Sequence, residues 1–206
     1  MKLKVCGMKY KKNIASVAAL QPNYLGFIFY DKSSRFFESE IPELPNSIKK
    51  TGVFVKEKIE TVNHLTKRHS LKAVQLHGSE SPEYCKILRE SNVKIIKVFS
   101  IKDTFNFDAL TPYEGIVDYF LFDTKGKLPG GNGYTFNWDV LKAYPSTTPY
   151  FLSGGIGINE VENIKAFKKS PASKYCYAID VNSKFEIEPG LKNINELEKF
   201  KHELQH

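Results

Sequence analysis

Two residues of this 206-residue sequence, Cys6 and Asp123, could move protons, and His77 stands in a similar place. Each stands at the end of a short apolar run, where a strand would stop. A cysteine whose surroundings favour the thiolate can serve as a general base, and a carboxylic acid can serve as a general acid. Each residue also has a purely structural interpretation, since free cysteines are commonly buried, histidines can be satisfied inside a core, and an aspartate can cap a turn.

A second group of residues suits an anionic ligand. Arg35 follows the second apolar run and could pair with a carboxylate, or lie on the surface as an ordinary cation. The pair Gly154-Gly155 precedes a helix-like segment, where backbone N–H groups can approach a phosphate, although glycines can also simply turn the chain. The turn 180–183 follows the last apolar run in the same way. The residues expected to bind substrate are Arg35, His77, Gly154, Gly155, Asp180, Asn182 and Ser183.

The glycine-rich segment 126–134 (GKLPGGNGY) is typical either of a surface loop or of a lid that closes over a ligand. Metal or redox chemistry has less support. The three cysteines are widely spaced and form no disulfide or zinc pattern, and the five histidines are dispersed. We therefore expect no metal and no cofactor.

The composition is that of an ordinary globular domain, with 41% hydrophobic and 26% charged residues. The net charge is +7, but the lysines are scattered, which favours a basic surface that attracts small anions over nucleic-acid binding. No apolar run approaches the roughly 18 residues of a membrane span, and residues 1–13 hold no apolar stretch of signal-peptide length. We expect one domain over residues 1–206, in the cytoplasm, without nucleic-acid or membrane partners.

The candidate residues are separated by a regular alternation of strand-like and helix-like segments. Short apolar runs predict strands at Leu3–Cys6, Tyr24–Tyr30, Thr51–Val55, Ala73–His77, Ile95–Phe99, Tyr119–Asp123, Tyr150–Ser153 and Cys176–Val181. Helical spacing predicts helices at Ile14–Leu20, Lys58–His69, Pro82–Ser91, Trp138–Tyr144, Asn159–Phe167 and Ile194–Leu204. Prolines interrupt the two poorer helix candidates, Phe36–Ser47 and Asp103–Gly115.

This alternation indicates an α/β protein with a parallel sheet. Several runs are continuously apolar, as strands covered on both faces must be. Eight strand–helix units with right-handed crossovers fit a closed (β/α)8 TIM barrel. An open doubly wound sheet is the alternative, but it would favour a phosphate loop after the first strand, whereas the glycine-rich turns here come late. In a barrel the carboxyl ends of all strands share one face, which would bring the candidate residues together.

Six segments carry a more specific signal, and together they span nearly the whole chain. They are KVCGMK at 4–9, GFIFYDKSSRF at 26–36, VQLHGSE at 74–80, LFDTKGKLPGGNGYTFNW at 121–138, FLSGGIGINEV at 151–161 and AIDVNSKFEIEPGLKN at 178–193. In this order they resemble the phosphoribosylanthranilate isomerase family of tryptophan biosynthesis. The resemblance implies a (β/α)8 barrel and an Amadori rearrangement of N-(5-phospho-β-D-ribosyl)anthranilate to 1-(2-carboxyphenylamino)-1-deoxy-D-ribulose 5-phosphate.

The resemblance also implies roles for individual residues. It makes Cys6 the general base, Asp123 the general acid and Arg35 the partner of the anthranilate carboxylate. The paired glycines and the turn 180–183 would hold the phosphate. No metal or cofactor is required by this chemistry.

The sequence departs from the family near these residues. Ser34 stands where the family usually has proline, and Asn193 stands where it has aspartate. Asn182-Ser183-Lys184 replaces the usual Ser-Ser-Gly. The backbone there must suit a lysine, so we expect a negative φ at Lys184 and a side chain in solvent.

Two alternative functions stay open. One is a related aminoaldose-phosphate isomerase on the same barrel, which the presence of Arg35 disfavours. The other is a non-catalytic barrel that binds a phosphate ligand or nucleic acid, which the presence of both Cys6 and Asp123 disfavours. The sequence does not predict the oligomeric state.

Overall fold

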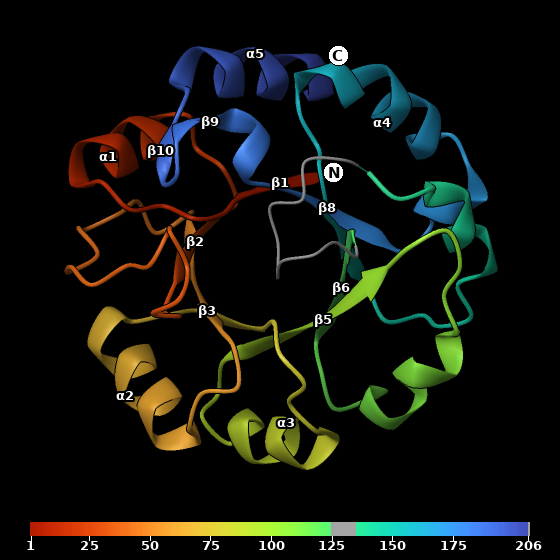
Figure 1. Ribbon diagram of the computed structural model, residues 1–206, viewed down its shortest axis with the longest axis horizontal. Coiled ribbons are helices and arrows are strands. Elements are labelled where there is room, and N and C mark those ends of the chain that lie inside the picture. Colours follow the sequence, from red (N-terminus) through yellow and green to blue (C-terminus); the bar gives the residue numbers. More distant parts are fainter. Residues whose placement is uncertain (125–134, 206) are drawn as a thin grey trace.

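The computed structural model describes residues 1–124 and 135–205, and its centre is a closed barrel of eight parallel strands (Figure 1). The strands are β1 (Lys2–Val5), β2 (Tyr24–Ile28), β3 (Lys49–Phe54), β4 (Ala73–Leu76), β5 (Lys94–Ile101), β6 (Tyr119–Thr124), β7 (Tyr150–Leu152) and β8 (Cys176–Val181). Strands adjacent in sequence are adjacent in the barrel, and β1 pairs with β8 to close it. The predicted barrel is therefore confirmed over the open sheet, and each predicted strand is found within a few residues of its expected bounds.

Helices surround the barrel (Figure 1). The α-helices are α1 (Lys11–Ala19), α2 (Ile59–His69), α3 (Pro82–Arg89), α4 (Val161–Lys168) and α5 (Ile194–Gln205). The 3-10 helices are η1 (Phe107–Tyr113), η2 (Trp138–Ala143), η3 (Ile158–Glu160), η4 (Pro171–Ser173) and η5 (Ser183–Phe185). The start of α3 follows from local chemistry, because the Ser81 side chain accepts a hydrogen bond from the Tyr84 backbone and Pro82 takes the first helical position.

Three crossovers differ from a regular strand–helix unit. The segment between β5 and β6 holds the 3-10 helix η1, which contains Pro112. The predicted helix Trp138–Tyr144 is the 3-10 helix η2 instead of an α-helix. It ends at Ala143, because Pro145 disfavours the α conformation of Tyr144, which is extended. Residues 36–47, which the structure describes in full, form no helix. Their prolines remove the backbone donors that a helix interior would need.

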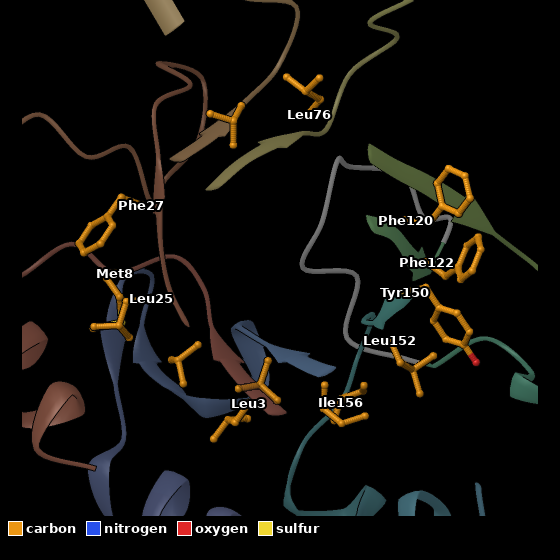
Figure 2. Close-up of a cluster of buried hydrophobic side chains, with 14 of the residues drawn as sticks. Leu3, Met8, Leu25, Phe27, Leu76, Phe120, Phe122, Tyr150, Leu152 and Ile156 are labelled. Carbon is orange, nitrogen blue, oxygen red and sulfur yellow. The ribbon is translucent and has the colours of Figure 1, made fainter. Parts of the chain in front are cut away.

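Side-chain alternation divides the buried apolar residues into two layers. In β6, Phe120 and Phe122 belong to the large outer cluster between strands and helices, whereas Leu121 belongs to a small inner cluster drawn from the strands. Figure 2 shows part of the outer cluster, where the rings of Phe122 and Tyr150 pack at 5.2 Å. Burial of each large apolar side chain stabilises the fold by about 1.5–3 kcal/mol.

The amino end of the barrel holds tyrosines and lysines. The hydroxyl groups of Tyr24 and Tyr177 lie 3.1 Å apart. Lys2 Nζ donates to the Tyr177 hydroxyl at 2.8 Å, and Lys49 Nζ donates to the Tyr24 hydroxyl at 3.4 Å. Among the described residues, no helix is long and apolar enough to cross a membrane.

A two-stranded hairpin follows the barrel. Its strands are β9 (Glu186–Glu188) and β10 (Leu191–Lys192), which pair antiparallel. Asn13 of α1 fastens the hairpin, because its Oδ1 accepts from the Lys192 backbone at 2.8 Å and its Nδ2 donates to the Lys192 carbonyl at 2.9 Å. Residues 179 positions apart are thereby joined.

Candidate active site

A cavity of about 330 Å³ opens at the carboxyl ends of the barrel strands. Every residue that the sequence analysis selected for chemistry or binding lines this cavity. These residues are Cys6, Arg35, His77, Asp123, Gly154, Gly155, Asp180, Asn182 and Ser183. Barrel geometry explains the gathering, since each residue lies at or just beyond the end of a strand.

Cys6 follows β1 and is 4% exposed. Burial raises the pKa of its thiol, and the nearby Lys4 ammonium opposes that rise. Burial in the free site therefore disfavours the thiolate that a cysteine base needs. Lys4 lies two residues earlier on the same strand, so both side chains point into the barrel.

Lys4 is fully buried and forms an ion pair with Asp180, with 2.8 Å between Nζ and Oδ2. Burial alone would lower the pKa of Lys4, but the charges of Asp180 and Cys6 and the hydrogen bonds to them together outweigh burial, and the pKa is raised. The other carboxylate oxygen of Asp180, Oδ1, is buried without a hydrogen-bond partner among the described residues. A buried acceptor without a donor is costly, so Asp180 Oδ1 suits a ligand hydroxyl. Lys4 was missed in the sequence analysis, although its spacing from Cys6 was a usable signal.

Asp123 and His77 face each other across the cavity wall. His77 Nε2 lies 3.5 Å from Asp123 Oδ2, while Asp123 Oδ1 accepts from the Thr124 backbone at 2.9 Å. Gln75 Nε2 lies 3.2 Å from His77 Nδ1. In the tautomer whose Nδ1 accepts from Gln75, Nε2 carries the ring proton and faces Asp123.

The glycine turn after β7 depends on both of its residues having positive φ, +91° at Gly154 and +67° at Gly155. A Cβ on Gly154 would lie 2.2 Å from Thr124 Oγ1 and 2.4 Å from the Thr124 backbone nitrogen. Among the described residues, the backbone N–H groups of Gly155 and Ser183 meet no hydrogen-bond acceptor. Both residues line the cavity, so these two donors are placed to bind a phosphate.

Lys184 is exposed, lies in η5 and does not line the cavity. It is absent from the non-glycine residues with positive φ, so the predicted negative φ is confirmed. Its neighbour Asn182 lines the cavity, but the Asn182 side chain is already engaged, because Lys192 Nζ donates to its Oδ1 at 2.7 Å.

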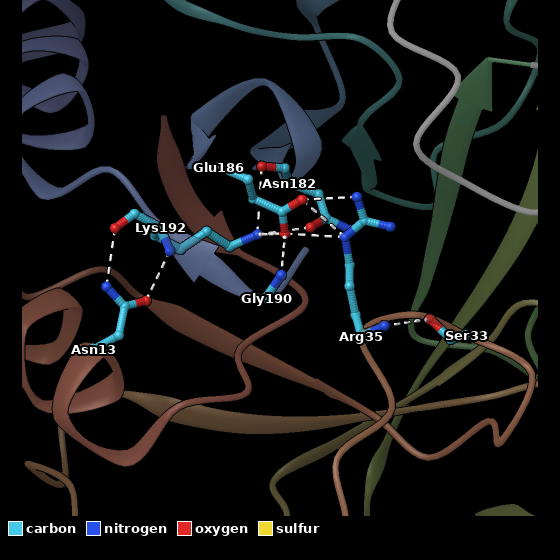
Figure 3. Close-up of polar contacts among 7 residues, drawn as sticks. All are labelled: Asn13, Ser33, Arg35, Asn182, Glu186, Gly190 and Lys192. Carbon is cyan, nitrogen blue, oxygen red and sulfur yellow. Dashed lines mark hydrogen bonds and ion pairs between the residues drawn. The ribbon is translucent and has the colours of Figure 1, made fainter. Parts of the chain in front are cut away.

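Arg35 reaches the cavity from the loop after β2 and is held by Glu186, as Figure 3 shows. Arg35 Nε donates to both Glu186 oxygens at 2.9 and 3.0 Å, and Nη2 donates to Oε2 at 2.7 Å. Lys192 Nζ donates to Oε1 at 2.7 Å. The sequence analysis missed Glu186 and Lys192, although both lie in the segment 178–193 that it quoted.

These contacts determine the charges of the network. Burial acts to raise the pKa of Glu186, but the hydrogen bond from Arg35 and the charge of Lys192 outweigh it, and the pKa is lowered. Burial lowers the pKa of Lys192 to about 8, against the pull of Glu186. Glu186 is therefore a carboxylate at neutral pH.

The possible lid at 126–134 lies outside the described residues. Among the residues that the structure does describe, no three His, Cys, Asp or Glu side chains are grouped so as to hold a metal ion.

Comparisons with known proteins agree on one family. The sequence model described as N-(5'phosphoribosyl)anthranilate (PRA) isomerase matches residues 3–203. The chain is 43% identical over 214 residues to N-(5'-phosphoribosyl)anthranilate isomerase of Parabacteroides distasonis, which covers 100% of this chain and 94% of the relative.

Two solved structures are similar over 100% of this chain and 98% of theirs. One is phosphoribosyl anthranilate isomerase from Thermus thermophilus, with a TM-score of 0.84 and 25% identity. The other is a phosphoribosyl anthranilate isomerase in complex with reduced 1-(o-carboxyphenylamino)-1-deoxyribulose 5-phosphate, with a TM-score of 0.78 and 26% identity.

Proposed function

The chain belongs to the N-(5'-phosphoribosyl)anthranilate isomerase family, and on that premise we propose how the residues of its cavity perform the reaction. The activity is the aldose–ketose isomerisation of tryptophan biosynthesis that turns an N-ribosylanthranilate phosphate into the corresponding aminoketose phosphate. One observation carries the proposal: a single cavity is lined by a thiol, a carboxyl group, a guanidinium group and a glycine turn.

Asp123 is the general acid and Cys6 is the general base. Asp123 gives a proton to the ribose ring oxygen as the bond from C1 to that oxygen breaks, which leaves an iminium ion. Cys6 then removes the proton from C2, and the resulting enolamine becomes the ketone when C1 gains a proton and the hydroxyl group on C2 loses its proton. The free thiol must lose its proton before this step, so the raised pKa of Cys6 makes the reaction sensitive to pH.

The remaining cavity residues orient the substrate. Arg35 pairs with the anthranilate carboxylate, because a guanidinium group matches the planar geometry of a carboxylate. Gly155 and Ser183 offer backbone N–H groups to the phosphate from two sides. His77 and Asp180 face the ribose hydroxyls between these two ends.

We further propose that residues 1–206 act as one catalytic domain in the cytoplasm. A reducing compartment keeps cysteine thiols free, and all three cysteines of the chain are unpaired, including Cys6. Phosphate binding by backbone amides alone explains why an exposed Lys184 can stand in place of the family's glycine.

The test is turnover of N-(5-phosphoribosyl)anthranilate by the purified protein, followed as the loss of substrate fluorescence. Arg35→Ala is compared with the wild type for binding of two product analogues, with and without the aromatic carboxylate. A loss of about 1.5–3 kcal/mol for the carboxylate analogue alone is expected. Equal losses for both analogues would show that Arg35 is structural or serves the phosphate.

A further inference from the structure

Glu186 occupies only one edge of the Arg35 guanidinium group. A guanidinium group can bind a carboxylate in two ways: the Nε and Nη2 edge or the Nη1 and Nη2 edge donates the hydrogen bonds. Glu186 takes the first edge, with contacts of 2.7–3.0 Å to Nε and Nη2. Among the described residues, no acceptor is bonded to Nη1, and Figure 3 shows this nitrogen directed away from Glu186. The second edge is therefore open on a side chain that lines the cavity.

Glu186 is itself fixed from two further directions. Lys192 Nζ donates to Oε1 at 2.7 Å, and the Gly190 backbone donates to the same oxygen at 3.0 Å. The Glu186 side chain is 5% exposed. The Glu186 carboxylate therefore has little conformational freedom. Its hydrogen bonds restrict the Arg35 side chain, which would otherwise sample many rotamers.

Close packing limits the alternatives open to Arg35. A Cβ on Gly7, which has φ +72°, would lie 2.8 Å from Arg35 Cδ. The Arg35 backbone N–H also donates to Ser33 Oγ at 3.1 Å, which restrains the loop that carries it. Backbone and side chain are thus both held in one place beside the cavity.

The charges of the network also suit one additional anion. Arg35 and Lys192 contribute two positive charges and Glu186 contributes one negative charge, which leaves a net charge of one. An aromatic carboxylate on the open edge would neutralise that charge. A network without Glu186 would set two cations side by side, and the buried Lys192 would lose the carboxylate that keeps it protonated.

We propose that Glu186 is a positioning residue, which holds Arg35 so that its Nη1/Nη2 edge receives the carboxylate of the substrate. Lys192 anchors Glu186 from behind. The inference rests on the proposed contact of Arg35 with that carboxylate, and it adds the residue that makes the contact geometrically specific.

Two ligands and four variants test the proposal. The ligands are reduced 1-(o-carboxyphenylamino)-1-deoxyribulose 5-phosphate and the matched phenylamino compound that lacks the carboxylate. The variants are Glu186→Gln, Arg35→Ala, their combination, and the control Glu40→Gln. Glu40 pairs with Arg68 but is 64% exposed and does not line the cavity, so its substitution removes the same charge outside the site.

Glu186→Gln should weaken the carboxylate ligand about tenfold and the phenylamino ligand less than about twofold. In the double variant, Glu186→Gln should cause no further loss of affinity beyond that of Arg35→Ala, because Glu186 acts through the Arg35 side chain. Glu40→Gln should change neither affinity. Unchanged or tighter binding of the carboxylate ligand by Glu186→Gln, beside a selective loss in Arg35→Ala, would overturn the inference and leave the proposed function intact.

If Arg35→Ala itself fails to discriminate between the two ligands, the role of Arg35 falls and this inference falls with it. If Glu186→Gln does not fold, a crystal structure of the wild type with the carboxylate ligand decides. A carboxylate on the Nη1/Nη2 edge, with Glu186 still on the other edge, supports the proposal. A ligand carboxylate that displaces Glu186 from Nε overturns it.

Discussion

Replacement of Gly154 by alanine should destabilise the fold and weaken phosphate binding together. Gly154 has φ +91°, and its added Cβ would lie 2.4 Å from the Thr124 backbone nitrogen. Thr124 cannot yield, because it belongs to β6 and pairs with Ile101 of β5. The glycine turn must therefore move, and it takes the neighbouring N–H group of Gly155 away from the phosphate position.

Gly115 supplies a matched control, because it has φ +71° and nothing within 4 Å of its added Cβ. The left-handed conformation costs alanine about 1–2 kcal/mol. Alanine also reduces the conformational entropy of the unfolded chain, which stabilises the folded state by about 0.4–1 kcal/mol. Gly115→Ala should therefore lose about 0.5–1 kcal/mol of unfolding free energy. In Gly154→Ala, the steric overlap with Thr124 costs about 1–3 kcal/mol more, so the total loss of unfolding free energy should be about 3 kcal/mol.

Urea unfolding at constant m-value measures both losses, and steady-state turnover measures KM for the phosphorylated substrate. Gly154→Ala should raise KM, while Gly115→Ala should leave it unchanged. Equal destabilisation of the two variants, with KM unchanged in both, would refute the reasoning, since the contact with Thr124 would then impose no constraint.

Three further predictions concern the acid–base pair, the pH dependence of activity and the pH dependence of stability. Cys6→Ser and Asp123→Asn should each lower kcat by a factor on the order of 10²–10⁴ with a smaller change in KM, and near wild-type turnover by fluorescence assay would contradict their roles. Burial raises the pKa of Cys6, so kcat/KM should still be rising at about pH 9. Lys4→Met should shift this rise to higher pH, because it removes a cation that lowers the pKa of Cys6. A pH–rate profile that levels off below about pH 8 would contradict the assignment of Cys6 as the base. Burial acts to raise the pKa of Tyr177, but hydrogen bonds with Lys2, Tyr24 and Tyr119 lower the pKa to about 8. The folded state then releases the phenolic proton before the unfolded chain does, so stability should increase as the pH rises from about 8 to about 10, and Tyr177→Phe should abolish both this increase and the phenolate absorbance that appears near pH 8.

The strands were predictable because local sequence determines them. The strand Cys176–Val181 is found with the predicted bounds, because a short, continuously apolar run is typical of a strand that is covered on both faces. The helices after them were less predictable. The segment from Trp138 has helical spacing, but it forms the 3-10 helix η2, and apolar spacing does not distinguish a short 3-10 helix from a short α-helix.

The candidate site was predictable in its outline for a topological reason: a parallel barrel brings every strand end to one face. Its buried ion pairs were not. Lys4 and Asp180 are separated by 176 positions, and no local pattern indicates that a lysine will be buried against an aspartate so far along the chain. The partner of Arg35 escaped for the same reason, because Glu186 looks like an exposed residue of a charged hairpin.

Closure of the barrel by its first and last strands determines when the enzyme can begin to work. β1 leaves the ribosome first and stays an open sheet edge until Val181, its partner in β8, has been synthesised. Until then Lys4 has no carboxylate beside it, and the cavity lacks the turn that follows β8. The hairpin that steadies Arg35 arrives later still, with Lys192. A chain that ends before Lys192 therefore lacks the cation that pairs with Glu186.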